Sequence, residues 1–464
     1  MSAENNKAEE LQEKREARRK RRIRNQILAY SVVIVLIIAI GAGLLAMISA
    51  VSKRSDKKGG PSKSLPVIAS ESESEQSSEE DEFSTETEEV VSSEPEESTE
   101  ETEPVILEPT YEEKLDEIVN AAIAVMPLED KVAGLFMVTP EILTGVGPVS
   151  KAGPSTKDAL QKKAVGGILY RTQNIKNADS FKEMISNTNQ YTKYPLFLAV
   201  EEEGGNATQL VKAKLGTKTD TAKAIAATGD VQNAYQAGVT IGTYLKEYGL
   251  NMNFAPVADL ANVDKSVMAE RSFGGDAQTV VGYVKNMAKG MKEQGITPAI
   301  KHFPGMGSVT TDTEKSRAIS ERTEEEFWAS EMDLFHKLVE DECPVIMVSN
   351  MAAPALTGDN APCSLSSKVV TEILRQQLNY KGLIITDCLN EKAISDYYSP
   401  EEAAILALKA GCDMILCPEN LDKAYNGVLT AVQDGTIAQE RVDDALRRIY
   451  RIKFADRVEN TDNN

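Results

Sequence analysis

Short apolar runs alternate with longer amphipathic stretches over most of this chain. In two of the stretches, 230–249 and 367–382, apolar residues recur every three to four positions and a glycine ends the pattern, as in an amphipathic helix. The runs themselves are uninterrupted, which is typical of strands buried on both faces of a parallel sheet. They begin at positions 135, 166, 196, 250, 297, 344, 382 and 413.

This alternation predicts an α/β fold. Eight strand–helix units fit a (β/α)8 TIM barrel, which we expect over residues 109–460. A doubly wound sheet is the alternative, but no Gly-rich phosphate turn follows the first run. In a barrel, the functional residues lie at the carboxyl ends of the strands.

The N-terminal part has a different pattern. Residues 1–26 contain nine Lys or Arg residues, and residues 27–51 are apolar and uncharged. An apolar helix of this length spans a bilayer core of about 30 Å, and it is longer than the core of a secretory signal. We predict a transmembrane anchor at 27–51. Five Lys or Arg residues follow it, so the basic N-terminus is expected in the cytoplasm and the barrel outside the cell, on a single-pass protein of the cell membrane.

Residues 52–108 are expected to form a linker. Its segment 71–103 holds sixteen acidic residues and no Lys or Arg. A segment with so little apolar surface cannot offset the entropy of ordering, and like charges extend it. The interpretation is a disordered Ser/Glu/Thr-rich stalk between membrane and barrel. A partner-binding role for the acidic run is the alternative.

Charge and composition exclude several functions. The net charge is −21, which disfavours nucleic acid as a partner because phosphate contacts need Lys and Arg. Five cysteines without C-x-x-C spacing read as buried small side chains, and two histidines are too few for a His-based metal centre. We expect no metal and no cofactor, and a monomeric protein.

Polar residues follow five successive predicted strands. The strands end in "VEEEGG", "FAPVAD", "IKHFPG", "VSN" and "ITDCLN". Any one of these charges alone reads as a solvated loop residue, but the set predicts a carboxylate-rich pocket with a few cations. Such a pocket suits polyhydroxylated molecules and the two-carboxylate chemistry of glycoside hydrolysis.

Three motifs in this order, "ERSFGGD", "KHFPG" and "GLIITDCLN", carry a family resemblance. From about residue 128 to 454 the chain resembles glycoside hydrolase family 3, in particular its single-domain β-N-acetylglucosaminidases. The resemblance implies a barrel and a retaining hydrolase, of β-N-acetylhexosaminidase type, acting on amino-sugar glycans such as cell-wall fragments.

The resemblance also implies roles for individual residues. Asp387 matches the family nucleophile, which forms a covalent glycosyl-enzyme intermediate. Lys301 and His302 match a pair that binds sugar hydroxyls, and Arg271 matches another sugar-binding position. Glu201 stands where the family usually has an Asp that contacts hydroxyls at the far side of the ring.

Several positions depart from the family pattern. The family's loop after strand five carries an Asp-x-His pair whose His is the general acid/base, and here the corresponding residues are Asp312 and Glu314. Met306 and Asn350 stand in place of two other family-typical histidines, and we expect Asn350 to contact the substrate. Asn206 replaces the usual Arg after the Gly pair.

Two hypotheses follow for the loop. In the first, Glu314 is the proton donor, because the neighbouring Asp312 carboxylate would raise its pKa toward the range of a general acid. In the second, the site is inactive and the protein is a wall glycan-binding pseudo-hydrolase. A barrel that only spaces partners is a third possibility, which the shared presence of Asp387, Lys301, His302 and Arg271 disfavours.

Overall fold

The computed structural model describes residues 109–341 and 343–458. The predicted basic N-terminus (1–26), transmembrane anchor (27–51) and acidic linker (52–108) lie outside these residues. Among the helices of 109–341 and 343–458, none has both the length and the apolar character needed to cross a membrane.

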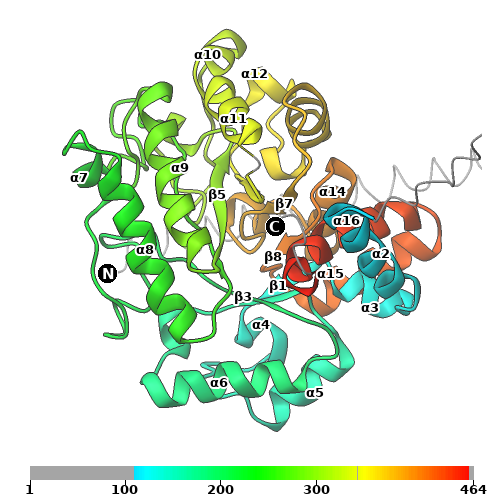
Figure 1. The fold of residues 1–464 in the computed structure, drawn as a ribbon. Coiled ribbons are helices and arrows are strands. Elements are labelled where there is room, and N and C mark those ends of the chain that lie inside the picture. Colours follow the sequence, from blue (N-terminus) through cyan, green and yellow to red (C-terminus); the bar gives the residue numbers. More distant parts are fainter. Residues whose placement is uncertain (1–108, 342, 459–464) are drawn as a thin grey trace, which may run out of the picture. The chain divides into compact units, whose positions relative to one another are not determined.

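Eight parallel strands form one sheet in the described part of the chain (Figure 1). Every strand falls in one of the eight apolar runs, so the strand prediction is confirmed. The strand bounds are β1 (Phe136–Val138), β2 (Gly167–Leu169), β3 (Phe197–Val200), β4 (Met252–Asn253), β5 (Thr297–Phe303), β6 (Val345–Val348), β7 (Leu383–Thr386) and β8 (Ile415–Leu416).

The strand order is that of a barrel. Neighbours in the sheet run β7-β6-β5-β4-β3-β2-β1-β8, so each strand pairs with the one before it in sequence and β1 pairs with β8. A parallel bridge between Ile385 and Met414 brings β7 and β8 together at the two ends of this order. The eight strands therefore form a nearly closed parallel barrel, as predicted.

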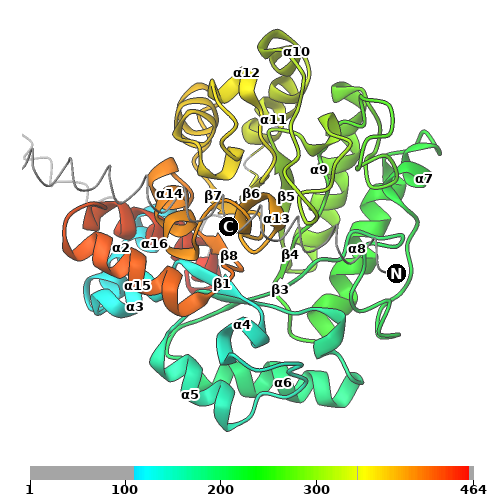
Figure 2. The same cartoon turned by 180° about the vertical axis from the view of Figure 1, so that it is seen from behind.

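Helices surround the strands (Figures 1 and 2). The stretch predicted as a helix at 230–249 forms α8, and the one at 367–382 forms the π-helix η4 (Lys368–Gln377). The α-helices are α2 (Tyr111–Ala124), α3 (Leu128–Ala133), α4 (Pro140–Thr144), α5 (Pro154–Lys162), α6 (Ala178–Tyr191), α7 (Ala222–Ala226), α8 (Gln232–Glu247), α9 (Ala277–Glu293), α10 (Glu324–Ala329), α11 (Glu331–Glu340), α12 (Pro354–Thr357), α13 (Lys392–Ser395), α14 (Pro400–Ala410), α15 (Leu421–Gln433) and α16 (Gln439–Lys453).

Side-chain caps fix where several helices begin. The carboxylate of Asp276 accepts the backbone N–H of Thr279 at the start of α9, and Asn420 does the same for α15. Each cap satisfies a backbone donor that has no partner inside the helix. These caps fix the residues at which α9 and α15 begin.

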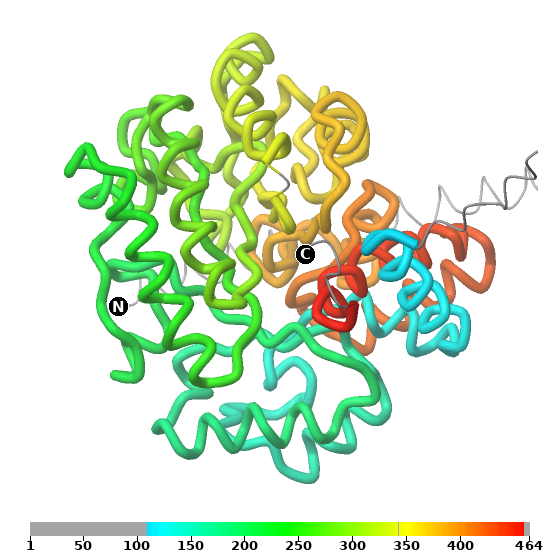
Figure 3. The backbone as a smooth tube through the Cα atoms, in the orientation of Figure 1, coloured from blue at the N-terminus to red at the C-terminus, as the bar shows by residue number. Residues whose placement is uncertain are grey.

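Two glycines let α8 and α9 approach each other closely; Figure 3 shows the two green helices side by side. A Cβ added to Gly238 on α8 would lie 2.2 Å from the carbonyl oxygen of Met287, and one on Gly290 of α9 would lie 2.4 Å from that of Tyr235. Real Cβ atoms do not approach backbone so closely. The two helices must therefore separate if either glycine gains a side chain.

Gly290→Ala is expected to destabilise the barrel by about 1–3 kcal/mol, the usual cost of overpacking a close interface. Gly282→Ala is the matched control on the same helix, because a Cβ there meets only a Val231 methyl at 3.4 Å. That variant should be neutral or stabilising, since alanine gains about 0.5–1 kcal/mol over glycine inside a helix. Urea unfolding of both variants measures the difference, and equal stabilities would contradict the close packing.

Candidate active site

The barrel collects the predicted polar residues at one end. Parallel strands of a barrel share an orientation, so residues that directly follow different strands meet at the same rim. The rim residues are Arg171 after β2, Glu201 and Glu203 after β3, Asp259 after β4, Lys301 and His302 within the last part of β5, Asn350 after β6, and Asp387 after β7.

A buried lysine forms the centre of an ion-pair cluster. The Lys301 side chain is 1% exposed, and its Nζ lies 2.5 Å from Glu201 Oε1 and 2.6 Å from Glu203 Oε1. Arg171 Nη1 lies 3.0 Å from Glu201 Oε2. Arg271 donates from Nε to Glu203 Oε2 over 2.8 Å. Three cations thus share two carboxylates. The protonation of each of these residues therefore depends on the charge of the others.

These ion pairs determine the protonation states of the cluster. Burial alone would raise the pKa of Glu201, but Lys301, Arg171 and Arg271 overcome that effect and hold it well below its ordinary value. The same balance of burial against Lys301 and Arg271 lowers the pKa of Glu203. Both carboxylates are therefore ionised near neutral pH, when they can accept hydrogen bonds from sugar hydroxyls.

His302 lies between two aspartates. Its Nδ1 is 2.6 Å from Asp259 Oδ2, and its Nε2 is 3.9 Å from Asp387 Oδ2. Asp259 also accepts the backbone N–H of Met306 over 2.6 Å, so it fixes the end of β5 as well as the imidazole ring. A carboxylate on one ring nitrogen orients the other nitrogen, which here faces Asp387.

Asp387 lies at the carboxyl end of β7, where the sequence placed it. Its backbone N–H donates to the Val348 carbonyl over 2.8 Å, and its Oδ1 accepts the N–H of Cys388 over 2.8 Å. The side chain is 12% exposed. A carboxylate held in this way at the rim, beside a histidine and a charged cluster, can act as a nucleophile toward a sugar bound there.

Asp312 and Glu314 lie on the loop after β5, which we name the acid loop (residues 309–318). Part of the Glu314 side chain reaches solvent, while the rest is shielded from it, and the backbone N–H of Glu314 donates to Asp312 Oδ1 over 3.0 Å. Partial burial raises the pKa of Glu314, and the negative charges of Asp312, Glu201 and Asp387 raise it further, opposed by Arg171. The predicted direction is confirmed, although burial contributes more than Asp312 does.

Asn350 has contacts that the sequence did not predict. It is buried, and its Nδ2 donates to the Cys388 carbonyl over 2.8 Å and to Glu391 Oε2 over 2.9 Å. Its Oδ1 accepts from Ser364 Oγ over 2.6 Å. These contacts occupy the amide within the protein. Substrate binding by Asn350 stays a prediction, and the contacts do not support it.

Three residues of the rim, and Glu391 next to it, were missed as site residues in the sequence. Glu203 and Asp259 lie inside motifs that were noted, and their roles follow only from the contacts with Lys301 and His302. Arg171 directly follows the second apolar run and could have been found by the same strand-end rule. Glu391, four residues after Asp387, gave no signal that distinguishes it from a solvated loop acid.

Cys388 and Cys417 lie side by side behind Asp387. Both are buried and free, as are the other cysteines. Arg171 Nη2 donates to Cys388 Sγ over 3.5 Å. The hydrogen bond with Cys417, together with burial, raises the pKa of Cys388 well above its ordinary value. A thiol that holds its proton is a poor nucleophile, in agreement with the interpretation of Cys388 as a small packing residue.

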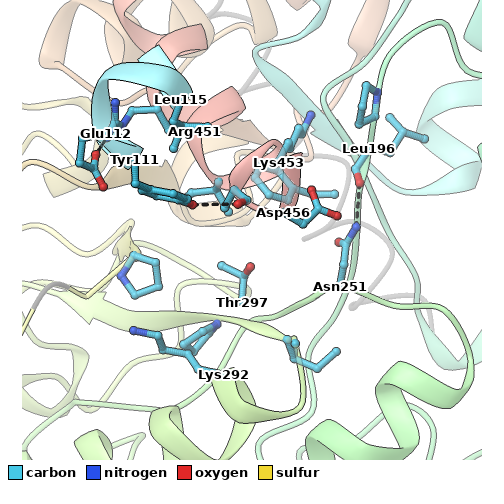
Figure 4. A pocket seen from close by; sticks show the side chains of 18 residues that line it. Tyr111, Glu112, Leu115, Leu196, Asn251, Lys292, Thr297, Arg451, Lys453 and Asp456 are labelled. Atoms are coloured by element: carbon cyan, nitrogen blue, oxygen red, sulfur yellow. Dashed lines mark hydrogen bonds and ion pairs between the residues drawn. The ribbon is translucent and has the colours of Figure 1, made fainter. Parts of the chain in front are cut away.

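A large hollow lies at the opposite end of the barrel. It measures about 780 Å³ and is lined by residues near the starts of β3, β5 and α2 and by the end of α16. Figure 4 shows Tyr111 and Arg451 on one side of it and Lys292 and Thr297 on the other. None of the predicted site residues lines this hollow. Catalysis in barrels occurs at the carboxyl ends of the strands, so the rim around Asp387 is the better candidate despite the size of this cavity.

Comparison with known proteins agrees with the fold. The sequence profile of the "Glycosyl hydrolase family 3 N terminal domain" matches residues 127–452. A β-N-acetylglucosaminidase/β-glucosidase of Cellulomonas fimi is 27% identical over 299 residues, which cover 62% of this chain and 52% of that protein. A β-hexosaminidase of Methylobacillus flagellatus is 28% identical over 271 residues, 57% of this chain and 76% of the relative.

Solved structures of this family have the same fold. A glycoside hydrolase family 3 β-N-acetylglucosaminidase from Paenibacillus sp. str. FPU-7 superposes with a TM-score of 0.67 at 29% identity, covering 72% of this chain and 64% of that one. The chain thus spans about half the length of the Cellulomonas enzyme and under two thirds of the Paenibacillus enzyme. M. tuberculosis LpqI matches with a TM-score of 0.65 at 26% identity and is covered over 96% of its length. With a family profile matched along most of its length and a barrel of the same architecture, the chain belongs to glycosyl hydrolase family 3.

Proposed function

We propose that the protein is a retaining glycoside hydrolase of the β-N-acetylhexosaminidase type, acting on amino-sugar glycans. The observation that carries this proposal is a pair of carboxyl groups in different environments. Asp387 is held at the rim by backbone contacts, and Glu314 lies on the acid loop with a raised pKa. One ionised and one protonated carboxyl group are what retaining hydrolysis requires.

In the first step, the Asp387 carboxylate attacks the anomeric carbon, and the bond to the leaving oxygen breaks. Glu314 gives its proton to that oxygen, so the leaving group departs as an alcohol rather than an alkoxide. The product is a glycosyl ester of Asp387. In this proposal the ionised carboxylates of Glu201 and Glu203, with Lys301 and Arg271, bind the sugar hydroxyls.

In the second step, the Glu314 carboxylate takes a proton from water, and the water oxygen attacks the anomeric carbon. The ester bond breaks and Asp387 is released as a carboxylate. Two displacements at one carbon give net retention of configuration. The negative charges of Asp312 and Glu314 repel an anionic acceptor such as phosphate and favour water.

The test measures whether the full-length protein hydrolyses three substrates: aryl β-N-acetylglucosaminide, aryl β-glucoside and cell-wall fragments. We expect release of the aryl group from the N-acetylglucosaminide. NMR should show the β-anomer of the sugar as the first product. Release of none of the three would refute it. Saturable sugar binding without turnover would instead support the glycan-binding pseudo-hydrolase.

The pH dependence of kcat/KM should respond to Asp312. Because the donor must be protonated, activity is lost as pH rises through the raised pKa of Glu314. Asp312→Asn removes a negative charge, lowers the pKa of Glu314, and should move the alkaline limb of the profile to lower pH. Asp230→Asn, at an exposed aspartate between α7 and α8, is the control and should leave the limb in place. If the alkaline limb of the Asp312→Asn profile stays at the wild-type pH, Glu314 is not the group whose ionisation causes the loss of activity.

We further propose that the barrel works outside the cell, tethered by residues 27–51 and spaced from the membrane by the acidic linker. The support is the charge pattern of the N-terminal part of the sequence. Protease added to intact cells should release the barrel, and its complete protection would contradict this location.

A further inference from the structure

The middle of the acid loop is attached to the segment that follows β7. Thr313, between Asp312 and Glu314, is 1% exposed, although the residues beside it reach solvent. Its carbonyl accepts the backbone N–H of Ala393 over 3.0 Å. The residue at the centre of the Asp-x-Glu sequence therefore points into the protein.

The side chain of Thr313 meets a buried carboxyl group. Glu391 is 9% exposed, and its carboxyl group is hydrogen-bonded by the Thr313 side chain and, on Oε2, by Asn350 Nδ2 over 2.9 Å. The proposed reaction makes no use of Glu391. A buried carboxyl group this close to a reaction centre needs a reason, because burying it is costly.

The orientation of Asn350 is determined independently of Glu391. The Cys388 carbonyl requires a donor, and Asn350 Nδ2 supplies it over 2.8 Å, while Ser364 Oγ donates to Asn350 Oδ1 over 2.6 Å. The amide therefore faces Glu391 with its remaining N–H. A continuous line of buried polar contacts runs from β6 through Asn350 and Glu391 to Thr313.

We propose that Glu391 is a positioning residue: held by Asn350, it fixes Thr313 and thereby holds Glu314 in place for proton transfer at Asp387. This inference rests on the proposed function, in which Glu314 is the donor. Glu391 itself touches neither of the reacting bonds. Its action is to reduce the freedom of an otherwise exposed loop.

The protonation of Glu391 is compatible with this role. Burial raises its pKa well above the ordinary value, and the charges of Asp387 and Glu314 raise it further, against hydrogen bonds from Asn350 and Thr313. The Glu391 carboxyl group accepts hydrogen bonds from Asn350 Nδ2 and from the Thr313 hydroxyl, so both partners hold it in place.

The kinetic test compares Glu391→Ala and Thr313→Val on aryl glycosides with poor and with activated leaving groups. Misplacing a catalytic group by about 1 Å costs roughly 10²-fold. We expect such a loss in kcat/KM for poor leaving groups and little loss for activated ones, which need no proton. Glu391→Gln and Thr313→Ser, which keep the hydrogen bonds, should retain most activity. Thr188→Val, at a buried threonine of α6, is the matched control and should not change the leaving-group dependence.

A double-variant cycle separates positioning from general stability. In a Glu314→Gln background the donor is already absent. Adding Thr313→Val should therefore leave the dependence of kcat/KM on the leaving group unchanged. Equal losses for both kinds of leaving group, or additive losses in the cycle, would overturn the inference.

Hydrogen exchange at the acid loop tests the attachment without any activity. Glu391→Ala and Thr313→Val should each speed exchange at residues 309–318, and Thr188→Val should not. If both variants exchange faster than the wild type but the wild type releases no sugar, the attachment of the loop is upheld while the hydrolase is refuted. Unchanged exchange together with unchanged leaving-group dependence would refute the role of Glu391 and leave the hydrolase standing.

Discussion

Asp387→Ala is expected to lower kcat for aryl N-acetylglucosaminide by on the order of 10⁶-fold, the scale seen when an enzyme loses its nucleophile. Without the carboxylate no glycosyl ester forms, and water must attack the anomeric carbon unaided. The fold should survive, because the backbone contact of Asp387 with Val348 does not involve the side chain. Initial rates with an activated substrate provide the measurement.

A covalent probe identifies the nucleophile directly. A mechanism-based fluorosugar should label the wild type on the peptide that contains Asp387, and should leave Asp387→Ala unlabelled. Circular dichroism of the variant checks that the barrel is folded. Labelling of another carboxylate, or an alanine variant with nearly full activity, would remove Asp387 from the mechanism.

Glu314→Gln is expected to lower kcat/KM by about 10²–10⁴-fold for substrates with poor leaving groups, the usual contribution of a general acid. For activated leaving groups kcat/KM should change little, because they depart without a proton. With those substrates kcat should still fall and a burst of product should appear, since Glu314 is also the base of the second step. Rapid-mixing kinetics with a series of aryl glycosides makes the comparison.

The control for this variant is Glu321→Gln, at an exposed glutamate just beyond the acid loop. It should behave as wild type with every leaving group. If kcat/KM of Glu314→Gln falls by the same factor for poor and for activated leaving groups, Glu314 does not donate the proton. The glycan-binding alternative would then gain support only if the wild type also binds sugar without turnover.

The fold followed from the sequence because its signal is local and repeated. Each strand is an uninterrupted apolar run, and Ile384 and Ile415, for example, are fully buried in the structure. The π-helical winding of Lys368–Gln377 could not be predicted, since its apolar spacing is that of an ordinary helix. The close approach of α8 and α9 was equally hidden, because a glycine in a helix does not reveal what lies opposite.

The position of the site could be predicted from the sequence, but the hydrogen-bond and ion-pair partners of its residues could not. The strand-end rule places Asp387, Lys301 and His302 at one rim, while the partners of each depend on side-chain directions across strands. Asn350 illustrates the difference: its position was predicted, yet it holds Glu391 rather than facing open space. Glu391 could not be recognised, because its burial results from the packing of two distant loops.

The ion-pair cluster and the acid loop differ in what depends on them. Lys301 is enclosed by charges from neighbouring strands, so a neutral substitution there removes the cation that Glu201 and Glu203 share, leaves them only Arg171 and Arg271, and destabilises the barrel. Glu314 is partly exposed, and the cation that acts on it, Arg171, also pairs with Glu201. Natural variation can therefore exchange the residue at position 314 at little cost to folding, whereas Lys301 is constrained by its two ion pairs. The chemistry of the acid loop can drift faster than the shape of the barrel that carries it.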